Sequence, residues 1–515
     1  MQLKSLAVSL FVLTAAVGGC GAVSDTPQNA PSAELNAAPL HTSGHVFEYP
    51  FGMCSNGNIR TNPEYAPAML DAGARMVRAD FTFGTIRPTS DPNPDNWNWK
   101  TLDEAAEVHR QYPKLEWLGL LGFGADWARA SKVETKRQSA INAPQAGIEI
   151  MPVDDPRNYF GQYVYETVRR YKGLIHVWES WNEPDLPGGH YFIGNGADFL
   201  PYQKACYLAA KKADPTCKVL FASMTYANVE GYLNLHHLKV PSPYPPTSCF
   251  FEEYLKAAAK DPDARKNNYY FDIMNQHSYS RATDLYDYAE INKKMMRDYI
   301  GTEMPIWITE MGIRDNSTPE KPQILGCTPD EYGDYLLQSY AWGTLGGVSK
   351  FFHFQLDNSN GHGLYVRVPI EPKPALAAYK LLTSEFANAT LLGQRHGHAG
   401  VGFLQGNSAY DPSWRTGYDL FEFEDLVANK RLWMAFTDDT GKVAIKIPAK
   451  GNTAVLIDRT GKRRPLTPTG GQYSVTLEGA TNIAGWPAGD NPAAKALGSP
   501  EHLVGGSTVI VEEAL

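Results

Sequence analysis

Residues 271–313, FDIMNQHSYSRATDLYDYAEINKKMMRDYIGTEMPIWITEMGI, contain the repeating unit that decides the fold. Segments 271–280 and 304–313 are short, begin with apolar residues and end near polar ones, as buried strands do. The segment between them, 285–300, spaces its apolar residues three and four apart, which indicates a helix. A strand, a helix and a second strand in this order predict a βαβ unit of a parallel sheet.

The same alternation extends from about residue 45 to 385. The other segments that we interpret as strands are 45–54, 73–83, 114–124, 173–184, 217–225 and 348–357. Eight strands, each followed by a helix, predict a (β/α)₈ TIM barrel of the α/β class. A doubly wound open sheet is the alternative, but it would need a glycine-rich phosphate turn, and the sequence shows none.

The texture of the sequence changes after about residue 387. Short alternating segments separated by Asp and Gly turns predict a C-terminal antiparallel β-sandwich. We therefore expect a catalytic barrel at 41–386 and an accessory sandwich at 387–515. Packing against the barrel is the expected role of the sandwich, and glycan binding of its own is the alternative.

The N-terminal region is typical of an exported protein. Lys4 precedes an apolar run of about a dozen residues, too short to span a bilayer, and small residues lead to Cys20. This order resembles a bacterial lipobox and predicts a signal peptide at 1–19 and an acylated Cys20 on a flexible tether at 20–40. We expect a cell envelope lipoprotein, periplasmic or on the outer-membrane surface, whose partner is the lipid bilayer. An ordinary signal with a chance cysteine is the alternative.

Composition bears on several classes of site. The formal net charge is −9 and no basic patch stands out, which argues against a nucleic-acid partner. No C-x-x-C spacing occurs, so we expect no metal and no cofactor.

An oxidising compartment permits disulfides, and Cys206–Cys217 and Cys249–Cys327 are candidate pairs, which leaves Cys54 free.

Barrel active sites lie at the C-terminal ends of the strands, so polar residues there are candidates. Glu183 and Glu310 end the fourth and seventh predicted strands and can face each other across the barrel mouth. Two such carboxyls can flank a glycosidic bond, one protonated to donate to the leaving oxygen and the other ionised to attack the anomeric carbon. The other polar strand ends are Arg78, Asp80, Asp126, Trp127, Asn182, His277, Tyr279 and 354–357.

Two of these motifs resemble a known group of enzymes. Trp181-Asn182-Glu183-Pro184 and Thr309-Glu310-Met311-Gly312 resemble clan A of the glycoside hydrolases. The run from Glu179 to Asp185 is most similar to the signature of glycoside hydrolase family 39. That signature would begin Trp-x-Phe, and His176 and Trp178 stand there instead. The resemblance implies a barrel followed by a β-sandwich.

The resemblance also implies roles for individual residues. Glu183 would be the general acid/base and Glu310 the nucleophile. Asn182 would donate to the sugar 2-hydroxyl, and Tyr279 would hydrogen-bond the nucleophile. Arg78 would lie beneath the nucleophile and lower its pKa through opposite charge.

Five further side chains are predicted from their positions on the strands. His277 and Trp127 are expected to line the sugar site, and Phe354 stands where the clan often has a tryptophan. Glu179, four residues before Glu183, is expected to form a structural ion pair with Arg78, and Trp178 is expected in the core.

Taken together, these motifs predict a retaining glycoside hydrolase. It would cleave a β-linked polysaccharide, an exopolysaccharide or hemicellulose, by double displacement. The alternatives are an exo-acting β-xylosidase-like enzyme, a transglycosidase and a non-catalytic glycan-binding lipoprotein.

Overall fold

The computed structural model describes residues 49–55, 58–130, 143–188, 190–236, 248–316, 326–357, 361–366, 371–397, 417–482 and 504–515. All of them belong to one compact unit, 36–515. The predicted signal peptide, Cys20 and the tether lie outside the described residues. Within the described ranges, no helix combines the length and the apolar character needed to cross a membrane.

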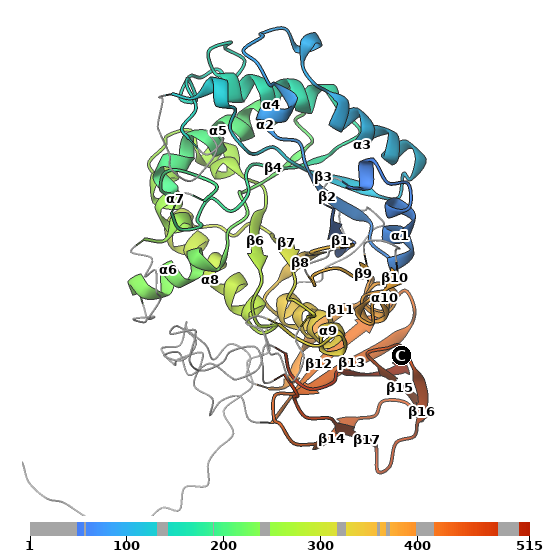
Figure 1. The fold of residues 1–515 in the computed structure, drawn as a ribbon. Coiled ribbons are helices and arrows are strands. Elements are labelled where there is room, and N and C mark those ends of the chain that lie inside the picture. The colour runs from blue at the N-terminus through green and yellow to red at the C-terminus, as the bar shows by residue number, and fades with distance from the viewer. Residues whose placement is uncertain are drawn as a thin grey trace, which may run out of the picture. The chain divides into compact units, whose positions relative to one another are not determined.

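Eight parallel strands form the predicted barrel (Figure 1). Their order around the sheet is β5-β4-β3-β2-β1-β8-β7-β6, and parallel bridges Leu220–Ile273 and Met224–Gln276 connect β5 to β6 and close it. Every strand lies within the segment predicted for it, so the fold class is confirmed. The strands are β1 (Phe51–Cys54), β2 (Met76–Asp80), β3 (Glu116–Leu120), β4 (Val177–Glu179), β5 (Lys218–Leu220), β6 (Met274–Ser278), β7 (Ile306–Met311) and β8 (Val348–His353).

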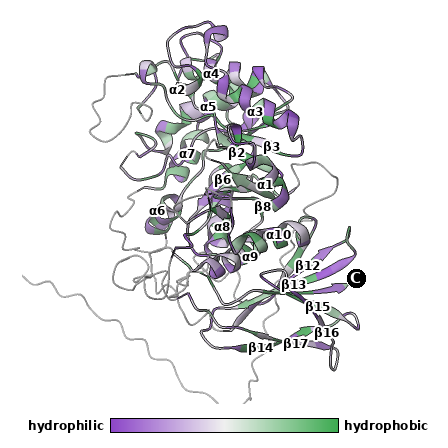
Figure 2. Ribbon diagram, turned by 45° about the vertical axis from the view of Figure 1, so that its right-hand side comes forward, coloured by the Kyte–Doolittle hydropathy of each residue, from purple (hydrophilic) through white to green (hydrophobic). Residues whose placement is uncertain are grey.

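The barrel interior is filled by apolar side chains, one from each strand or its start. Removing these side chains from water is favourable and makes the lower barrel a packed core rather than a channel. Hydrophobic residues are green in Figure 2 and run along the barrel strands. The interior cluster comprises Cys54, Met76, Leu118, Val177, Leu220, Ile273, Trp307 and Phe352.

Helices surround the strands, and two connections contain one α-helix more than the single helix expected after each strand. These are the connection after β2, with α2 and α3, and the connection after β5, with α6 and α7. The α-helices are α1 (Tyr65–Ala72), α2 (Phe83–Ile86), α3 (Lys100–Gln111), α4 (Tyr159–Arg170), α5 (Gly196–Ala213), α6 (Tyr226–His236), α7 (Phe250–Ala258), α8 (Asp284–Ile300), α9 (Pro329–Leu345) and α10 (Ala375–Glu385).

The cysteine pairing expected from the sequence is wrong. Cys54, Cys206, Cys217, Cys249 and Cys327 are all free and buried. Cys249 Sγ donates instead to Asn228, at 3.1 Å from its side-chain oxygen and 3.3 Å from its carbonyl. The thiols behave as small core residues, which removes the need for a covalent link.

The C-terminal strands form the predicted antiparallel sandwich. The six-stranded sheet has the order β11-β12-β13-β18-β15-β16, and β14 pairs with β17. A second apolar cluster, which includes Trp433, Ile447 and Tyr473, fills the space between the two sheets. The strands are β11 (Thr390–His396), β12 (Tyr418–Asp425), β13 (Lys430–Thr437), β14 (Val443–Pro448), β15 (Ala454–Asp458), β16 (Arg463–Leu466), β17 (Gln472–Leu477) and β18 (Val509–Ala514); β9 (Tyr365–Val366) and β10 (Glu371–Pro372) form a small separate hairpin.

The six-stranded sheet packs against α9 of the barrel through its other face. The Phe423 ring stacks on Tyr340 at 6.0 Å, and the Gln338 amide donates to the Gly506 carbonyl at 2.9 Å. Arg459 pairs with the buried Asp334 at 3.2 Å. Apolar stacking and paired charges therefore join the two domains.

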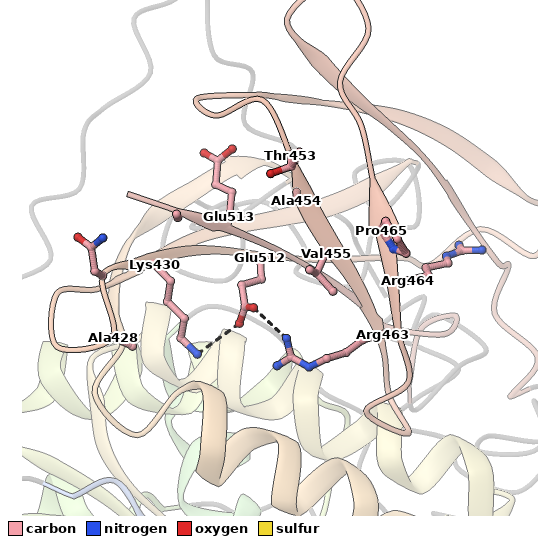
Figure 3. A pocket seen from close by; sticks show the side chains of 12 residues that line it. Ala428, Lys430, Thr453, Ala454, Val455, Arg463, Arg464, Pro465, Glu512 and Glu513 are labelled. Carbon is pink, nitrogen blue, oxygen red and sulfur yellow. Dashed lines mark hydrogen bonds and ion pairs between the residues drawn. The ribbon is translucent and has the colours of Figure 1, made fainter.

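Figure 3 shows a pocket of about 610 Å³ in this sheet. Two of its cations, Lys430 and Arg463, pair with Glu512, at 3.4 and 2.8 Å, and Arg463 also reaches Glu385 of α10 at 2.6 Å. None of the lining residues, all in the described part of the chain, is aromatic. A sugar bound in this pocket would find no aromatic ring on which to stack. The charged side chains of the pocket instead link the sandwich to the barrel through Glu385.

The start of α5 is stabilised by side chains that cap its free backbone amides. The N-cap is Asn195, whose side chain accepts from the Asp198 amide at 3.0 Å. The Asp198 carboxylate accepts in return from the Asn195 amide at 2.9 Å. Asp198 is thus the third helical residue of a capping box, a position where acids are also common.

Gly119 of β3 gives a test of the packing between the strands and the helices. A Cβ there would lie 2.5 Å from the Trp178 ring, which is fully buried, as predicted. We expect Gly119→Ala to lower the free energy of unfolding by about 1–3 kcal/mol, measured by chemical denaturation. Gly441→Ala is the control, because no atom lies within 4 Å of an added Cβ. Equal stability of both variants would contradict this packing.

Candidate active site

Arg78 of β2 is the centre of the polar cluster at the barrel mouth. Its guanidinium is buried and donates to both Glu179 oxygens, at 2.6 and 2.9 Å. It also donates to Glu310 at 2.5 Å and to the Asn182 side-chain oxygen at 2.8 Å. The predicted Arg78–Glu179 ion pair is confirmed, and one cation connects β2, β4 and β7.

Glu310 of β7 is held through both of its carboxylate oxygens. Arg78 donates to Oε1, and the Tyr279 hydroxyl donates to Oε2. Burial raises the pKa of Glu310, while the His277 ring, the Arg78 charge and the Tyr279 hydrogen bond oppose that rise. Two strong donors therefore favour the ionised form of a deeply buried carboxyl.

Glu183 follows β4 in a different environment. Its backbone has φ 46°, the left-handed region that a non-glycine residue enters at a cost of roughly 1–3 kcal/mol. Its amide donates to the Ser223 carbonyl at 3.0 Å, which helps hold this conformation. Burial raises the pKa of Glu183 to about 7, with a smaller opposing effect of Arg78. Of the two glutamates, this one is suited to carry a proton near neutral pH.

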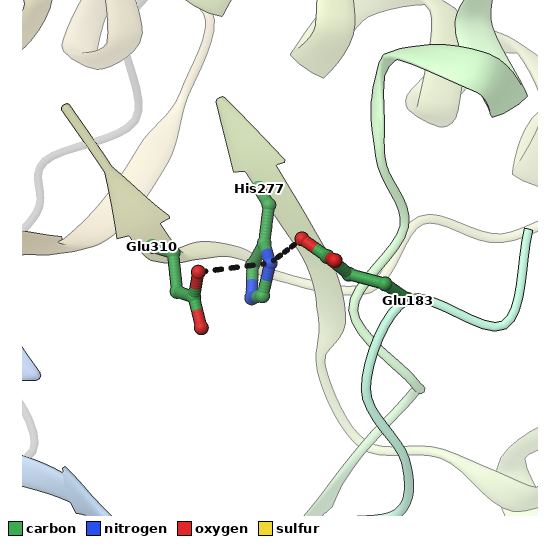
Figure 4. A group of neighbouring side chains, drawn as sticks. All are labelled: Glu183, His277 and Glu310. Carbon is green, nitrogen blue, oxygen red and sulfur yellow. Dashed lines mark hydrogen bonds and ion pairs between the residues drawn. The ribbon is translucent and has the colours of Figure 1, made fainter. Parts of the chain in front are cut away.

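His277 of β6 lies between the two glutamates (Figure 4). Its Nδ1 is 2.8 Å from Oε1 of Glu183 and 3.6 Å from Oε2 of Glu310. Burial lowers the pKa of His277 to about 4, so the ring is neutral at neutral pH. A neutral imidazole donates from one nitrogen and accepts at the other.

The hydrogen bonds behind His277 decide which nitrogen donates. Thr309 donates its hydroxyl to Asn275 at 2.7 Å, so its oxygen accepts from Nε2 of His277 at 3.0 Å. Nδ1 then carries the lone pair, and the contact with Glu183 requires the carboxyl to be the donor. This arrangement fits a protonated Glu183.

The same three side chains are the one group, within the described ranges, whose ligand atoms converge closely enough for a metal ion, all within 4.8 Å. Their surroundings do not suit a cation. The Arg78 guanidinium lies 2.5 Å from Glu310, and the Tyr279 hydroxyl is bonded to its other oxygen. The cluster is better suited to act as a pair of carboxyls than as a metal centre.

The remaining predicted residues are divided between the site and its surroundings. Asn182 is oriented by Arg78, which binds its oxygen and leaves its amide nitrogen to donate elsewhere. The Phe354 ring lies 5.7 Å from the Tyr279 ring and so belongs to the cluster. Trp127 does not join it in the described contacts, because its indole donates to the Arg87 carbonyl at 2.9 Å and packs on Tyr159.

Sequence reasoning missed several residues that support the site. Asp185 accepts from the backbone amides of Thr225 and Asn228, at 2.9 and 3.0 Å, and so ties the Glu183 loop to the start of α6. Burial raises the pKa of Asp185 to about 7. Asp185 belongs to the quoted signature, which was the available signal, whereas Thr309 and Asn275 are ordinary strand residues with none.

Comparisons with known proteins bear on the fold. No family model matches the chain, and no curated protein matches it. Solved structures do match. A family 39 glycoside hydrolase from the gut symbiont Bacteroides cellulosilyticus WH2 is 15% identical, with a TM-score of 0.59 over 91% of this chain and 82% of its own.

Two further structures also share this fold. A conserved exported protein from Bacteroides fragilis is 12% identical, with a TM-score of 0.58 over 90% of this chain and 97% of its own. A family 39 β-xylosidase from Caulobacter crescentus is 12% identical, with a TM-score of 0.51 over 91% and 96%. The fold that the motif resemblance implied is therefore confirmed.

Arg78 gives a stability test of this cluster. Arg78→Met would leave Glu179 and Glu310 buried without their cation, and we expect the free energy of unfolding to fall by about 3–5 kcal/mol. Adding Glu179→Gln to that variant removes one uncompensated charge and should restore part of the loss. Chemical denaturation of the two single variants and the double variant measures the coupling. Strict additivity would contradict a direct interaction.

Proposed function

We propose that this protein is a retaining glycoside hydrolase with Glu183 as general acid/base and Glu310 as nucleophile. The observation that carries the proposal is the pair of convergent carboxyls in opposite environments. Oxygens of the two glutamates lie within 4.8 Å of each other, close to the 5–5.5 Å typical of retaining enzymes. An inverting enzyme would need a wider gap to admit a water molecule.

The proposed reaction proceeds in two displacements. Glu310 attacks the anomeric carbon while Glu183 transfers its proton to the departing glycosidic oxygen, which gives a glycosyl-enzyme ester and a free alcohol. Glu183, now ionised, accepts a proton from water as that water attacks the anomeric carbon. The ester breaks, the sugar leaves, and both glutamates regain their starting states.

Other residues prepare the two carboxyls for these steps. Hydrogen bonds from Arg78 and Tyr279 favour the ionised form of Glu310 and orient it, and Nδ1 of His277 accepts a hydrogen bond from the protonated carboxyl of Glu183. The Asn182 amide nitrogen is free of Arg78 and can donate to the sugar 2-hydroxyl. Phe354 and Tyr279 offer ring surface beside the attacked sugar.

The substrate that we propose is a β-linked polysaccharide, an exopolysaccharide or hemicellulose, cleaved within the chain. The β-xylosidase named among the similar structures keeps an exo-acting enzyme as the second candidate. Product analysis separates them, because release of monosaccharide alone from a polymer would exclude internal cleavage.

We also propose export and anchoring through an acylated Cys20. The support is the lipobox-like sequence before that cysteine, and one similar structure is a conserved exported protein. Labelling of the full chain with a radioactive fatty acid in a bacterial host, compared with Cys20→Ser, tests the modification. Equal labelling of the two would exclude it.

Matched variants of the two glutamates test the mechanism. Reducing-end release is measured on a panel of β-linked polysaccharides and aryl glycosides. We expect Glu310→Gln to lose activity on every substrate that the wild type cleaves, because no covalent intermediate can form. Glu183→Gln should lose roughly 10²–10⁴-fold on polysaccharides and much less on dinitrophenyl glycosides, whose leaving group needs no proton.

Glu107→Gln is the control, since this exposed carboxylate lies on α3 and pairs only with Arg110 and Gln111 in the described contacts. Glycan binding without turnover on the whole panel would replace the proposal with a binding function.

The pKa of Glu183 predicts the shape of the pH profile. The general acid must be protonated, so kcat/KM for a polysaccharide should fall above about pH 7, by about tenfold per pH unit. For a dinitrophenyl glycoside, kcat/KM should fall much less over the same pH range, because its leaving group departs in the first displacement without a proton from Glu183. A polysaccharide profile that stays flat to pH 9 would contradict this assignment.

A further inference from the structure

The C-terminal end of β5 contributes an exposed aromatic ring to the barrel mouth. Tyr226 is the first residue of α6 and is 49% exposed. Within the described ranges it is the one aromatic among the large exposed apolar side chains. An exposed ring at the catalytic end of a barrel offers a flat apolar surface on which a sugar ring can stack.

Hydrogen bonds hold the backbone around Tyr226 next to the Glu183 loop. On one side of Tyr226, the Glu183 amide donates to the Ser223 carbonyl at 3.0 Å, and Asp185 accepts from the Thr225 amide and hydroxyl, both at 2.9 Å. On the other side, the Asn228 amide also donates to Asp185, at 3.0 Å. Burial and then the negative charges of Glu230, Asp185 and Glu183 raise the pKa of Tyr226, which reflects the same proximity.

The position of the ring relative to the two glutamates indicates which part of a substrate it meets. The nucleophile bonds to the anomeric carbon of one sugar, whereas the acid donates to the oxygen that leads to the next sugar. Tyr226 belongs to the acid's surroundings, and the described contacts of Glu310 are with Arg78, Tyr279 and His277. A ring on the acid's side meets the leaving group.

Glu230 provides a polar group one helical turn after Tyr226. Residues four apart share one face of a helix, so the two side chains lie along the same surface of α6. Glu230 is partly buried, which raises the pKa of its carboxyl to about 7, and within the described ranges no side chain pairs with it. A partly buried carboxyl that no protein group engages is available to accept hydrogen bonds from a ligand.

We propose that Tyr226 and Glu230 of α6 form the subsite for the sugar on the leaving-group side of the scissile bond, where Tyr226 stacks on the ring and Glu230 accepts from its hydroxyls. The proposal rests on the proposed glycosidase function and deepens it. A built leaving-group subsite favours substrates that continue beyond the cleaved bond, that is, oligo- and polysaccharides over simple glycosides.

The test compares two substrates of the full-length enzyme that differ only in their leaving group. One is the β-linked oligosaccharide that the wild type cleaves, and the other is the β-glycosyl fluoride of the same sugar, whose leaving group is a single atom. We expect Tyr226→Ala and Glu230→Ala each to lower kcat/KM for the oligosaccharide about tenfold, mainly through KM. Activity on the fluoride should stay within about twofold of wild type.

Two control variants separate stacking from helix damage. Tyr226→Phe retains the ring and should behave almost as the wild type. Leu235→Ala alters another residue of α6 that is 48% exposed. Leu235 is nine residues after Tyr226 and therefore lies on the opposite face of the helix. This variant should keep the wild-type kcat/KM for both substrates.

The outcomes distinguish this proposal from the function on which it rests. If Tyr226→Ala and Glu230→Ala leave the oligosaccharide kinetics unchanged, or lower kcat/KM equally for both substrates, the proposed subsite is overturned. The glycosidase function is still supported in that case, provided that the wild type hydrolyses the fluoride. A wild type inactive on both substrates would overturn the glycosidase function and the subsite together.

Discussion

The buried guanidinium of Arg78 is the interaction on which the rest of the site depends. It satisfies both oxygens of Glu179, one oxygen of Glu310 and the side-chain oxygen of Asn182. A cation in a low-dielectric interior must be paired with carboxylates, and Glu179 at 0% exposure supplies that pairing from below. Because Glu179 balances its charge, Arg78 can remain buried while it donates to Glu310 and favours the ionised form of that carboxyl.

The asymmetry between the two glutamates follows from what each one contacts. Glu310 is bonded to Arg78 and to the Tyr279 hydroxyl, both of which favour a charged carboxylate. Glu183 faces the lone pair of a neutral His277, which favours a protonated carboxyl. The contacts of these two groups of the same chemistry thereby favour opposite protonation states, and the proposed two-step displacement needs this difference.

Buried amides outside the site hold the Glu183 loop in place. Asp185 binds the Asn228 amide, and the Asn228 side chain donates to Asn292 at 3.3 Å. Asn292 donates in turn to Gln276 at 3.0 Å, next to His277. One continuous network of hydrogen bonds thus links the Glu183 loop, through α6 and α8, to the part of β6 that carries His277. Such a network is costly if broken and rigid when complete.

Local pattern alone determined the fold and the pair of glutamates. The alternation of strand and helix segments predicted the eight barrel strands and the later sandwich, because burial on both faces imposes continuous apolar runs. Position at strand ends predicted Glu183, Glu310, Arg78, His277 and Tyr279, since parallel strands place their C-terminal ends together. The ion pair of Glu179 with Arg78 also followed from spacing along one strand.

Features that depend on contacts between distant segments were decided by the tertiary structure. The five cysteines of the described ranges are free and buried, and the Trp127 indole donates to the Arg87 carbonyl. Helix α6, with Tyr226 at its start, has a weak local pattern and is anchored by Asp185 some 40 residues earlier. Protonation states depend likewise on burial and on partners from other strands. The sequence therefore predicted the two carboxyls, and through the motif resemblance a role for each, whereas the burial and the hydrogen-bond partners that make their environments differ are set only in the folded chain.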